Sequence, residues 1–341
     1  MNKNNNNYFF LTFYEENLAE LENVCNFASV FNLKKMRGLI TRTTGSWYKV
    51  LADNQQVVDC RLRGKFRISG IKQTNPLAVG DWVEFEIMED GNGLITAMEE
   101  RKNHLIRRAT KLSKQTHVIA ANIDLLCLVA TLGYPRTSTG FMDRMLVTAE
   151  AYHIPAVIVM NKIDLYNDEL WDIHNEIKEI YTNAGYQVYE VSALTGDGIN
   201  ELKNLIRGKV CLFSGHSGVG KSALLNAIDP TLDLREGEVS DWTLKGTHTT
   251  TFAEIFPFGG GYLIDSPGIK EFGMVDFEDA EVGHFFPEMR ARLHDCYFAN
   301  CTHRHEPRCA VKQAVEDGLI SEERYHNYLN ILESLNEERG R

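Results

Sequence analysis

Eight residues near the middle of the chain have the types and spacing of a phosphate-binding loop. The segment Gly215-His216-Ser217-Gly218-Val219-Gly220-Lys221-Ser222 matches the pattern G-x-x-x-x-G-K-[ST] in full. Its glycines let backbone amides turn toward phosphate oxygens, and the helix that follows adds a favourable dipole. We expect Lys221 to reach the β- and γ-phosphates of a nucleotide and Ser222 to bind Mg²⁺, with Ser214 beginning the loop.

A second motif predicts which base the nucleotide carries. Asn161-Lys162-Ile163-Asp164 follows an apolar segment at 156–160 and is similar to the guanine-specificity motif N-K-x-D of GTPases. Its Asp carboxylate accepts hydrogen bonds from guanine N1–H and the 2-amino group. Adenine lacks these donors, so the unpaired acceptors would cost about 1–3 kcal/mol. The pair of motifs favours GTP and GDP as ligands over the ATP of a metabolic ATPase, and a preference for ADP would overturn this assignment.

Two further segments complete the nucleotide site that the sequence predicts. Asp265-Ser266-Pro267-Gly268 resembles the D-x-x-G motif, in which Asp265 holds Mg²⁺ through water and the Gly268 amide contacts the γ-phosphate. Ser192-Ala193-Leu194 resembles the S-A-x motif that lies behind the guanine ring.

The residues that activate the attacking water are less conventional. Among the threonines at 249–251, Thr250 is our first choice and Thr249 the second for binding Mg²⁺. Many GTPases place Gln directly after D-x-x-G to orient the water, but Ile269 stands here and cannot do so. His248 adjoins the threonines and could orient or activate water near neutral pH, although an exposed loop histidine fits the pattern as well.

Alternating apolar and helical patterns from 119 to 272 supply the elements that must position these motifs. The continuous apolar run 123–130 is typical of a strand buried on both faces. The alternation predicts a mostly parallel sheet covered by helices. We expect strands at 123–130, 156–160, 187–191, 209–213, 252–256 and 262–264, and helices at 141–152, 169–184, 199–206 and from 221.

The order of the motifs is permuted. Ordinary GTPases run P-loop, Thr, D-x-x-G, N-K-x-D and S-A-x, whereas here N-K-x-D and S-A-L precede the P-loop. The same sheet can form if the chain is cut and rejoined elsewhere, so we expect a circularly permuted G domain. The D-x-x-G region then leads directly into the C-terminal segment, which could receive movement caused by loss of the γ-phosphate.

Residues 36–100 have an all-β pattern. About five short apolar segments are separated by turn residues such as Gly80-Asp81 and the run at 90–93. This predicts a small barrel of the OB type, with an SH3-like barrel as the alternative.

The charge distribution of the chain points to an anionic partner. The net charge is −11, yet residues 34–114 carry 16 Lys and Arg against 9 Asp and Glu. A basic segment in an acidic chain favours contact with nucleic acid, and a solvated surface is the alternative. The residues we expect to contact RNA are Arg61, Arg63, Lys65 and Arg67 in the barrel, and Arg107 and Arg108 in a basic connector at 101–118.

Residues 273–341 read as mainly helical and contain a possible metal site. Cys296, Cys301, His303 and Cys309 lie within fourteen residues, with His294 and His305 as competing nitrogen ligands. Three thiolates and one imidazole form a common structural zinc set, and four protein ligands leave no open position. We expect one structural Zn²⁺.

The remaining bulk features concern the two ends and the location of the chain. Residues 1–35 begin with an Asn-rich tract and are expected to be a disordered extension, with Met36 as a hypothetical true start. No secretion signal and no apolar run of about 18 residues is present, so we expect a cytoplasmic protein that does not contact membranes.

These pieces together resemble the ribosome small-subunit-dependent GTPase A family (RsgA) over about residues 36–341. The resemblance rests on the barrel segment 61–65, the connector ending at 119–124, the permuted motifs with 246–251 and the C-x4-C-x-H-x5-C set. It implies an OB-type domain, a permuted G domain and a zinc domain. It also implies GTP hydrolysis stimulated by the 30S subunit and a role in its late maturation with contacts to 16S rRNA.

We expect a monomeric GTPase of this kind. The alternative is an RNA-binding checkpoint factor that GTP switches and that has little intrinsic turnover.

Overall fold

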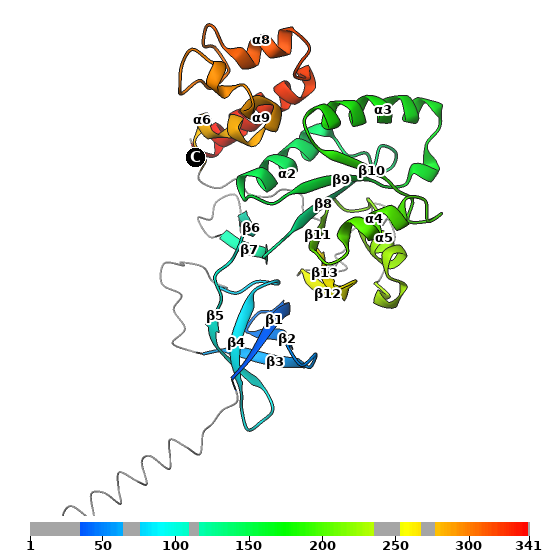
Figure 1. The fold of residues 1–341 in the computed structure, drawn as a ribbon, viewed down its shortest axis with the longest axis vertical. Coiled ribbons are helices and arrows are strands. Elements are labelled where there is room, and N and C mark those ends of the chain that lie inside the picture. Colours follow the sequence, from blue (N-terminus) through cyan, green and yellow to red (C-terminus); the bar gives the residue numbers. More distant parts are fainter. Residues whose placement is uncertain (1–34, 64–75, 109–115, 235–252, 267–276, 340–341) are drawn as a thin grey trace, which may run out of the picture.

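The computed structural model describes residues 35–63, 76–108, 116–234, 253–266 and 277–339. Three regions follow one another along the long axis of the molecule: a β-barrel, an α/β sheet and a group of helices (Figure 1). None of the described helices is both long and apolar enough to span a bilayer. Of the predicted extension 1–35, residues 1–34 lie outside the described residues, whereas Lys35 belongs to the first strand of the barrel. The site residues Lys65, Arg67, His248, Thr249, Thr250 and Gly268 also lie outside the described residues.

The first region is a closed five-stranded barrel. Strand β3 pairs parallel with β5, and β4 returns to pair with β1, which gives the order β1-β2-β3-β5-β4. This is the order of an OB-type barrel rather than an SH3-like one. Buried Ile40, Val50, Phe85 and Ile95 fill its interior. The strands are β1 (Lys35–Thr44), β2 (Trp47–Ala52), β3 (Val57–Leu62), β4 (Trp82–Ile87) and β5 (Gly93–Met98).

The basic connector contains a two-stranded antiparallel ladder, β6 (His104–Arg108) and β7 (Thr116–Ala121). Two of its cations are already paired with carboxylates. Arg101 forms a buried ion pair with Asp81 at 2.7 Å, and Lys102 pairs with Asp124 at 2.7 Å. The sequence pattern therefore overstated the free positive charge here, because these two partners are distant in sequence.

The second region is a six-stranded sheet in the order β10-β9-β8-β11-β13-β12. All neighbouring pairs are parallel except β12 with β13. Strand β1 of the barrel pairs antiparallel with β12 of this sheet, with Arg42 opposite Glu254. The strands are β8 (Leu125–Ala130), β9 (Ala156–Met160), β10 (Gln187–Glu190), β11 (Val210–Ser214), β12 (Glu254–Phe258) and β13 (Gly261–Asp265).

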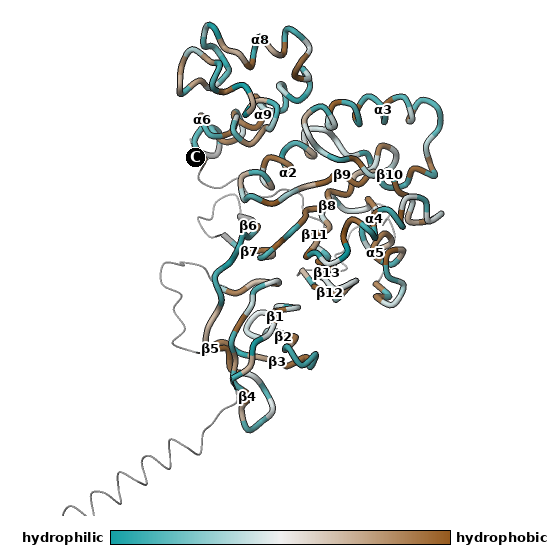
Figure 2. The backbone as a smooth tube through the Cα atoms, in the orientation of Figure 1, coloured by the Kyte–Doolittle hydropathy of each residue, from teal (hydrophilic) through white to brown (hydrophobic). Residues whose placement is uncertain are grey.

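Helices cover both faces of this sheet. Leu126 and Leu128 of β8 pack in one core, whereas Cys127 and Val129 pack in the other. The strand is therefore apolar at every position, as its brown colour in Figure 2 shows. Helices α2 (Thr139–Ala151) and α3 (Asp168–Asn183) belong to the first core, and α4 (Ile199–Ile206) and α5 (Lys221–Ile228) to the second.

The third region is helical and packs on α2. Its own core includes Val282, Phe286, Val311 and Tyr328, joined by Val147 of α2. The α-helices are α6 (Asp279–Val282), α7 (Pro287–Arg290), α8 (Ala310–Glu316) and α9 (Glu322–Arg339). The short 3-10 turns of the chain are η1 (Ile163–Leu165), η2 (Pro230–Leu232), η3 (Gly283–Phe285) and η4 (Leu293–Asp295).

A buried cation fastens α9 to α2. Arg324 is 1 % exposed, and its guanidinium donates to Asp143 of α2 and to Glu288 of α7. Asn327 adds a hydrogen bond to Asp143 at 2.7 Å. Buried charges are costly unless paired, so this network specifies how the two regions meet.

Most predicted elements are present, with shifts of one to three residues. Helix α2 begins at Thr139 instead of 141 because the Ser138 side chain accepts a hydrogen bond from the Phe141 amide. The predicted strand 252–256 is observed as Glu254–Phe258, where pairing with β13 decides the register.

Candidate nucleotide site and metal centre

The P-loop follows the central strand β11 and leads into α5. Gly215 and Gly220 have φ of 158° and 87°. A Cβ at Gly215 would lie 2.3 Å from the Val129 carbonyl oxygen, and one at Gly220 would lie 2.6 Å from Asn161 Nδ2. The glycines thus allow the P-loop backbone to approach strand β8 and the Asn161 side chain closely.

Lys221 lies across the P-loop. Its Nζ donates to the carbonyl oxygens of Gly215 and His216 at 2.8 and 3.0 Å. Burial lowers the pKa of Lys221 to about 8, against the opposing attraction of Asp265. The ammonium group is therefore held in the cradle where phosphate oxygens would bind, and an incoming anion would favour its charged form.

Asp265 ends strand β13 beside this lysine. Its side chain is 7 % exposed, and its Oδ1 atom has no hydrogen-bond partner among the described residues. Burial raises its pKa to about 6, although Lys221 acts in the opposite direction. A buried carboxylate oxygen without a partner suits a water molecule on a hard cation, and Ser222 follows Lys221 in the first turn of α5. The residues present therefore fit Mg²⁺.

Asn161 joins the predicted base-binding motif to the P-loop. Its Nδ2 donates to the Val219 carbonyl oxygen at 2.9 Å, and its Oδ1 accepts from the Ala193 amide at 3.2 Å. The side chain is 1 % exposed. One buried amide thus holds three of the predicted motifs together.

Lys162 also contacts the P-loop. It has φ of 66°, and its Nζ donates to the Gly218 carbonyl oxygen at 2.8 Å and the Tyr134 carbonyl oxygen at 3.1 Å. The amine is thereby committed to the protein, which leaves the alkyl chain as the part that could pack on a base.

Asp164 is exposed, and a hydrogen bond fixes one of its two carboxylate oxygens. Its Oδ1 accepts a hydrogen bond from Ser192 Oγ at 2.5 Å, which leaves Oδ2 without a protein donor among the described residues. Leu194 is 83 % exposed, and Ile163 and Ala193 are half-buried. An oriented carboxylate beside exposed apolar surface is suited to a planar base that offers two donors.

The loop after β8 also contacts the P-loop, which the sequence reasoning missed. Pro135, in a cis peptide bond after Tyr134, would lie 3.1 Å from a Cβ on Gly218. Phe141 of α2 meets the His216 ring edge-on, with centroids 4.8 Å apart. The Gly-Tyr-Pro signal at 133–135 marks a turn, but nothing local indicates what that turn touches.

The C-terminal cysteines and one histidine converge. One ligand atom from each of Cys296, Cys301, His303 and Cys309 lies within 4.8 Å of the others. His303 Nδ1 is 3.3 Å from Cys309 Sγ and 3.7 Å from Cys296 Sγ. These separations fit a tetrahedral Zn²⁺ with bonds of about 2.0–2.3 Å. His294 and His305, the competing candidates, are not in the cluster of the described residues.

Helix α9 holds the cysteine loop from one side. Tyr325 and Tyr328 donate to the carbonyl oxygens of His303 and Thr302, both at 2.6 Å. Glu306 accepts from Thr302 and Arg304, and these hydrogen bonds lower its pKa to about 2. The loop is thus anchored to the helix that also carries Arg324.

Comparison with known proteins gives the same organisation. The model of the RsgA GTPase domain matches residues 98–275, and that of the RsgA N-terminal domain matches residues 37–95. A protein named small ribosomal subunit biogenesis GTPase RsgA from Bacteroides fragilis is 50 % identical over 303 residues, covering 89 % of this chain and 98 % of its own. This chain belongs to the RsgA GTPase family. It is therefore a GTP hydrolase.

Solved structures extend the RsgA comparison to the fold. YjeQ from Thermotoga maritima is similar with a TM-score of 0.72 and 38 % identity, covering 88 % of this chain and 98 % of its own. YloQ, described as a circularly permuted GTPase, has a TM-score of 0.69 and 33 % identity, covering 90 % and 97 %. The permuted order predicted from the motifs is thus confirmed.

The buried carboxylate leads to a testable consequence for this RsgA GTPase. We expect Asp265→Asn to stabilise the nucleotide-free protein by about 1–3 kcal/mol at pH 7.5, because ionised Asp265 is disfavoured above its raised pKa. A raised pKa contributes stability that is present at low pH and lost as pH rises through about 6. The gain should therefore disappear near pH 4. Thermal unfolding in EDTA at pH 7.5 and at pH 4 measures the stability difference between variant and parent at each pH.

Asp164→Asn is the matched control, because Asp164 is an exposed carboxylate in the same site. It should change the stability of the nucleotide-free protein by less than about 0.5 kcal/mol. If Asp265→Asn proved less stable than the parent at pH 7.5, Asp265 would have to be satisfied within the protein, and its fit to Mg²⁺ would lose its basis.

Proposed function

We propose that this chain binds the small ribosomal subunit through its rRNA and hydrolyses GTP to GDP and phosphate during late maturation of that subunit. The observation that carries the proposal is the joining of three nucleotide motifs through Asn161, in a chain half identical to a protein named for small-subunit biogenesis. The 30S subunit and 16S rRNA are the partners, and the cytoplasm is the place of action. The protein works as a monomer.

The guanine end of the site follows from the contacts of three segments. Asp164 accepts from the base, with Ser192 orienting it, while Lys162 and the segment Ala193-Leu194 cover the ring faces. Asn161 and Ile163 support this arrangement from behind.

The phosphate end is formed by the P-loop, from Ser214 to Ser222. Its amides cradle the phosphates, and Lys221 releases the carbonyl oxygens of the loop to bind the β- and γ-oxygens. Mg²⁺ would be held by Ser222 and Thr250 and, through water, by Asp265, and it would neutralise charge on the transferred phosphoryl group. The Gly268 amide contacts the γ-phosphate.

His248 orients the attacking water, since Ile269 offers no polar group at the usual position. We expect His248→Ala to lower GTP turnover by about 100-fold or more while the affinity for GDP stays within twofold, because general acid–base groups contribute about 10²–10⁴-fold. Turnover and GDP titration on the same preparation test this, and unchanged turnover would remove His248 from the mechanism.

The structural Zn²⁺ would be held by Cys296, Cys301, His303 and Cys309, and it would cross-link the C-terminal loop. Basic residues of the barrel and connector, namely Arg61, Arg63, Lys65, Arg67, Arg107 and Arg108, contact RNA. Phosphate contacts of this kind weaken with added salt and carry little sequence preference.

Turnover with and without purified 30S subunits tests the main proposal. Strong stimulation supports an assembly GTPase. Negligible turnover together with nucleotide-dependent binding to the subunit would favour the second candidate, an RNA-binding checkpoint factor switched by GTP. Ile269 favours that candidate, because it stands where many GTPases have the Gln that orients the attacking water.

A further inference from the structure

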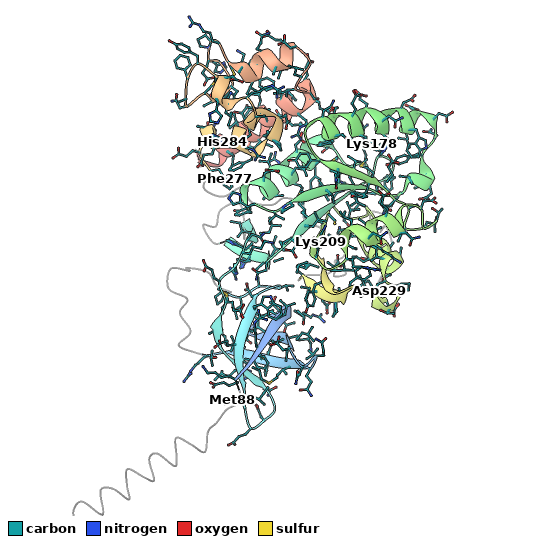
Figure 3. All side chains as sticks on the ribbon, in the orientation of Figure 1. Met88, Lys178, Lys209, Asp229, Phe277 and His284 are labelled. Carbon is teal, nitrogen blue, oxygen red and sulfur yellow. The ribbon has the colours of Figure 1, made fainter. Side chains whose placement is uncertain are left out.

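The barrel has a hollow of about 510 Å³ on its outer surface that the nucleotide chemistry does not use. Its lining includes Trp47, Arg61, Met88, Asp90, Gly93 and Leu94. Met88 is labelled in Figure 3 at the end of the barrel away from the α/β sheet. The hollow lies between strands β2 and β3 and the β4–β5 loop, which are surfaces that OB-type barrels use for oligonucleotides.

Three adjacent strands contribute one residue each to a single row. Trp47 of β2 pairs with Arg61 of β3, and Arg61 pairs with Leu94 of β5. Residues in register across a sheet present their side chains on the same face. The row therefore combines an indole, a guanidinium and an aliphatic side chain on one outward surface.

The Arg61 guanidinium is stacked on the indole. Its Cζ atom lies 3.8 Å from the centroid of the Trp47 ring. Among the described residues no ion pair is found for Arg61, although most neighbouring barrel cations have one, including Arg37 and Lys49. Planar guanidinium and aromatic groups are the surfaces on which unpaired bases stack.

Gly93 also lines the hollow, through its backbone. Gly93 stands opposite Cys60, and a Cβ at Gly93 would lie 2.3 Å from Cys60 Sγ. Because Cys60 is buried in the barrel core, this Cβ would point inward, so the core excludes a side chain at this position while the neighbouring Leu94 faces outward.

The charge of the rim selects the part of a nucleotide that could enter. Glu89 and Asp90 lie on the exposed β4–β5 loop. The two carboxylates would repel a phosphate group. They can accept hydrogen bonds from the amino groups of guanine, adenine or cytosine, which uracil lacks.

We propose that this hollow binds a single unpaired nucleobase of RNA and prefers bases that carry an exocyclic amino group. The base stacks on the Arg61–Trp47 pair and donates to Glu89 or Asp90, while phosphates remain outside on the basic residues. This inference rests on the proposed function, because it assigns a role within RNA binding.

Short single-stranded RNA probes test the proposal directly. With GDP-saturated full-length protein, we expect a labelled oligomer with one guanine among uracils to bind about tenfold more tightly than oligouridine. Trp47→Ala should abolish this preference and weaken binding of the guanine probe about ten- to one-hundred-fold. Fluorescence anisotropy at two salt concentrations should give the same salt slope for parent and variant.

Arg63→Ala is the matched control, because Arg63 is exposed and basic but does not line the hollow. It should weaken both probes equally and lower the salt slope by about one, as loss of a phosphate contact does. If Trp47→Ala unfolds, Arg61→Ala and Met88→Ala take its place, since both side chains are exposed.

Equal affinity of the parent for both probes, or a guanine preference that survives Trp47→Ala, would overturn the base site. These outcomes are distinguishable from failure of the proposed function, in which 30S subunits neither bind the protein nor stimulate its turnover. If 30S subunits stimulated turnover but the protein showed no base preference, its contacts with RNA would be made to phosphates alone.

Discussion

Asp164→Asn is expected to lower the affinity for GDP by at least 100-fold and to create affinity for xanthosine diphosphate. Guanine presents two donors to the Asp164 carboxylate, and each hydrogen bond to a charged group contributes about 1.5–3 kcal/mol. The NH₂ group of an Asn side chain would face the N–H donors of guanine, and two donors cannot hydrogen-bond to each other. Xanthine carries an oxygen at C2 instead of an amino group, so it can accept from the amide.

Titration with GDP, XDP and ADP measures the effect, and the ratio of GDP to XDP affinity should change by about 10⁴-fold. Ser192→Ala is the matched control. It removes the hydrogen bond that orients Asp164 but keeps the carboxylate, so GDP affinity should fall only about 5–10-fold. ADP binding as tight as that of GDP in the parent protein would contradict the guanine assignment.

Removal of zinc is expected to unfold the C-terminal helices while GDP binding is retained. Structural Zn²⁺ contributes about 10–16 kcal/mol to the folding of zinc-finger peptides, more than a small helical region can supply by burial alone. Cys301→Ser, or treatment with a strong chelator, should make residues 277–339 rapidly cleaved by protease. The G domain should remain protected.

Cys60→Ser provides the control for the cysteine substitution, because Cys60 is buried in the barrel and far from the cluster in sequence. It should leave one zinc per chain and an unchanged protease pattern at 277–339. If the metal-free protein resisted protease as the parent does, the four residues would be a buried cluster that needs no metal.

The zinc experiment also tests how the regions are coupled. Unfolding of α9 would withdraw Arg324 and leave Asp143 of α2 as a buried carboxylate without its cation. Helix α2 also touches the P-loop through Phe141 and His216. The sequence suggested only one route between the nucleotide and the C-terminal region, through the D-x-x-G segment. The contacts of α2 supply a second.

Much of the nucleotide site was predictable because its chemistry is local. The P-loop needs glycines, a lysine and a serine at fixed spacing, so Gly215 to Ser222 specify the loop and the start of α5 together. The apolar run of β8 indicated burial on both faces without any knowledge of its neighbours. The spacing of Cys296, Cys301 and Cys309 likewise predicted that they belong to one metal site.

Other features depended on partners far away in the chain. The N-K-x-D motif predicts that Lys162 binds the base, yet its amine donates to the carbonyl oxygens of Gly218 and Tyr134. Arg101 belongs to the basic connector that the sequence indicates, yet Asp81 neutralises it in a buried pair. Neither partner is marked by any local pattern.

The sequence by itself determined the motifs, their permuted order and the alternation of strands and helices, because these follow from residue type and short-range periodicity. Only the tertiary structure decided the closure of the barrel through β3–β5 and β1–β4, the choice of His303 over His294 and His305 for the cysteine cluster, and the burial of Arg324 against Asp143. These depend on which distant residues meet, and the free energy of such contacts comes from burial and pairing that exist only once the chain has folded.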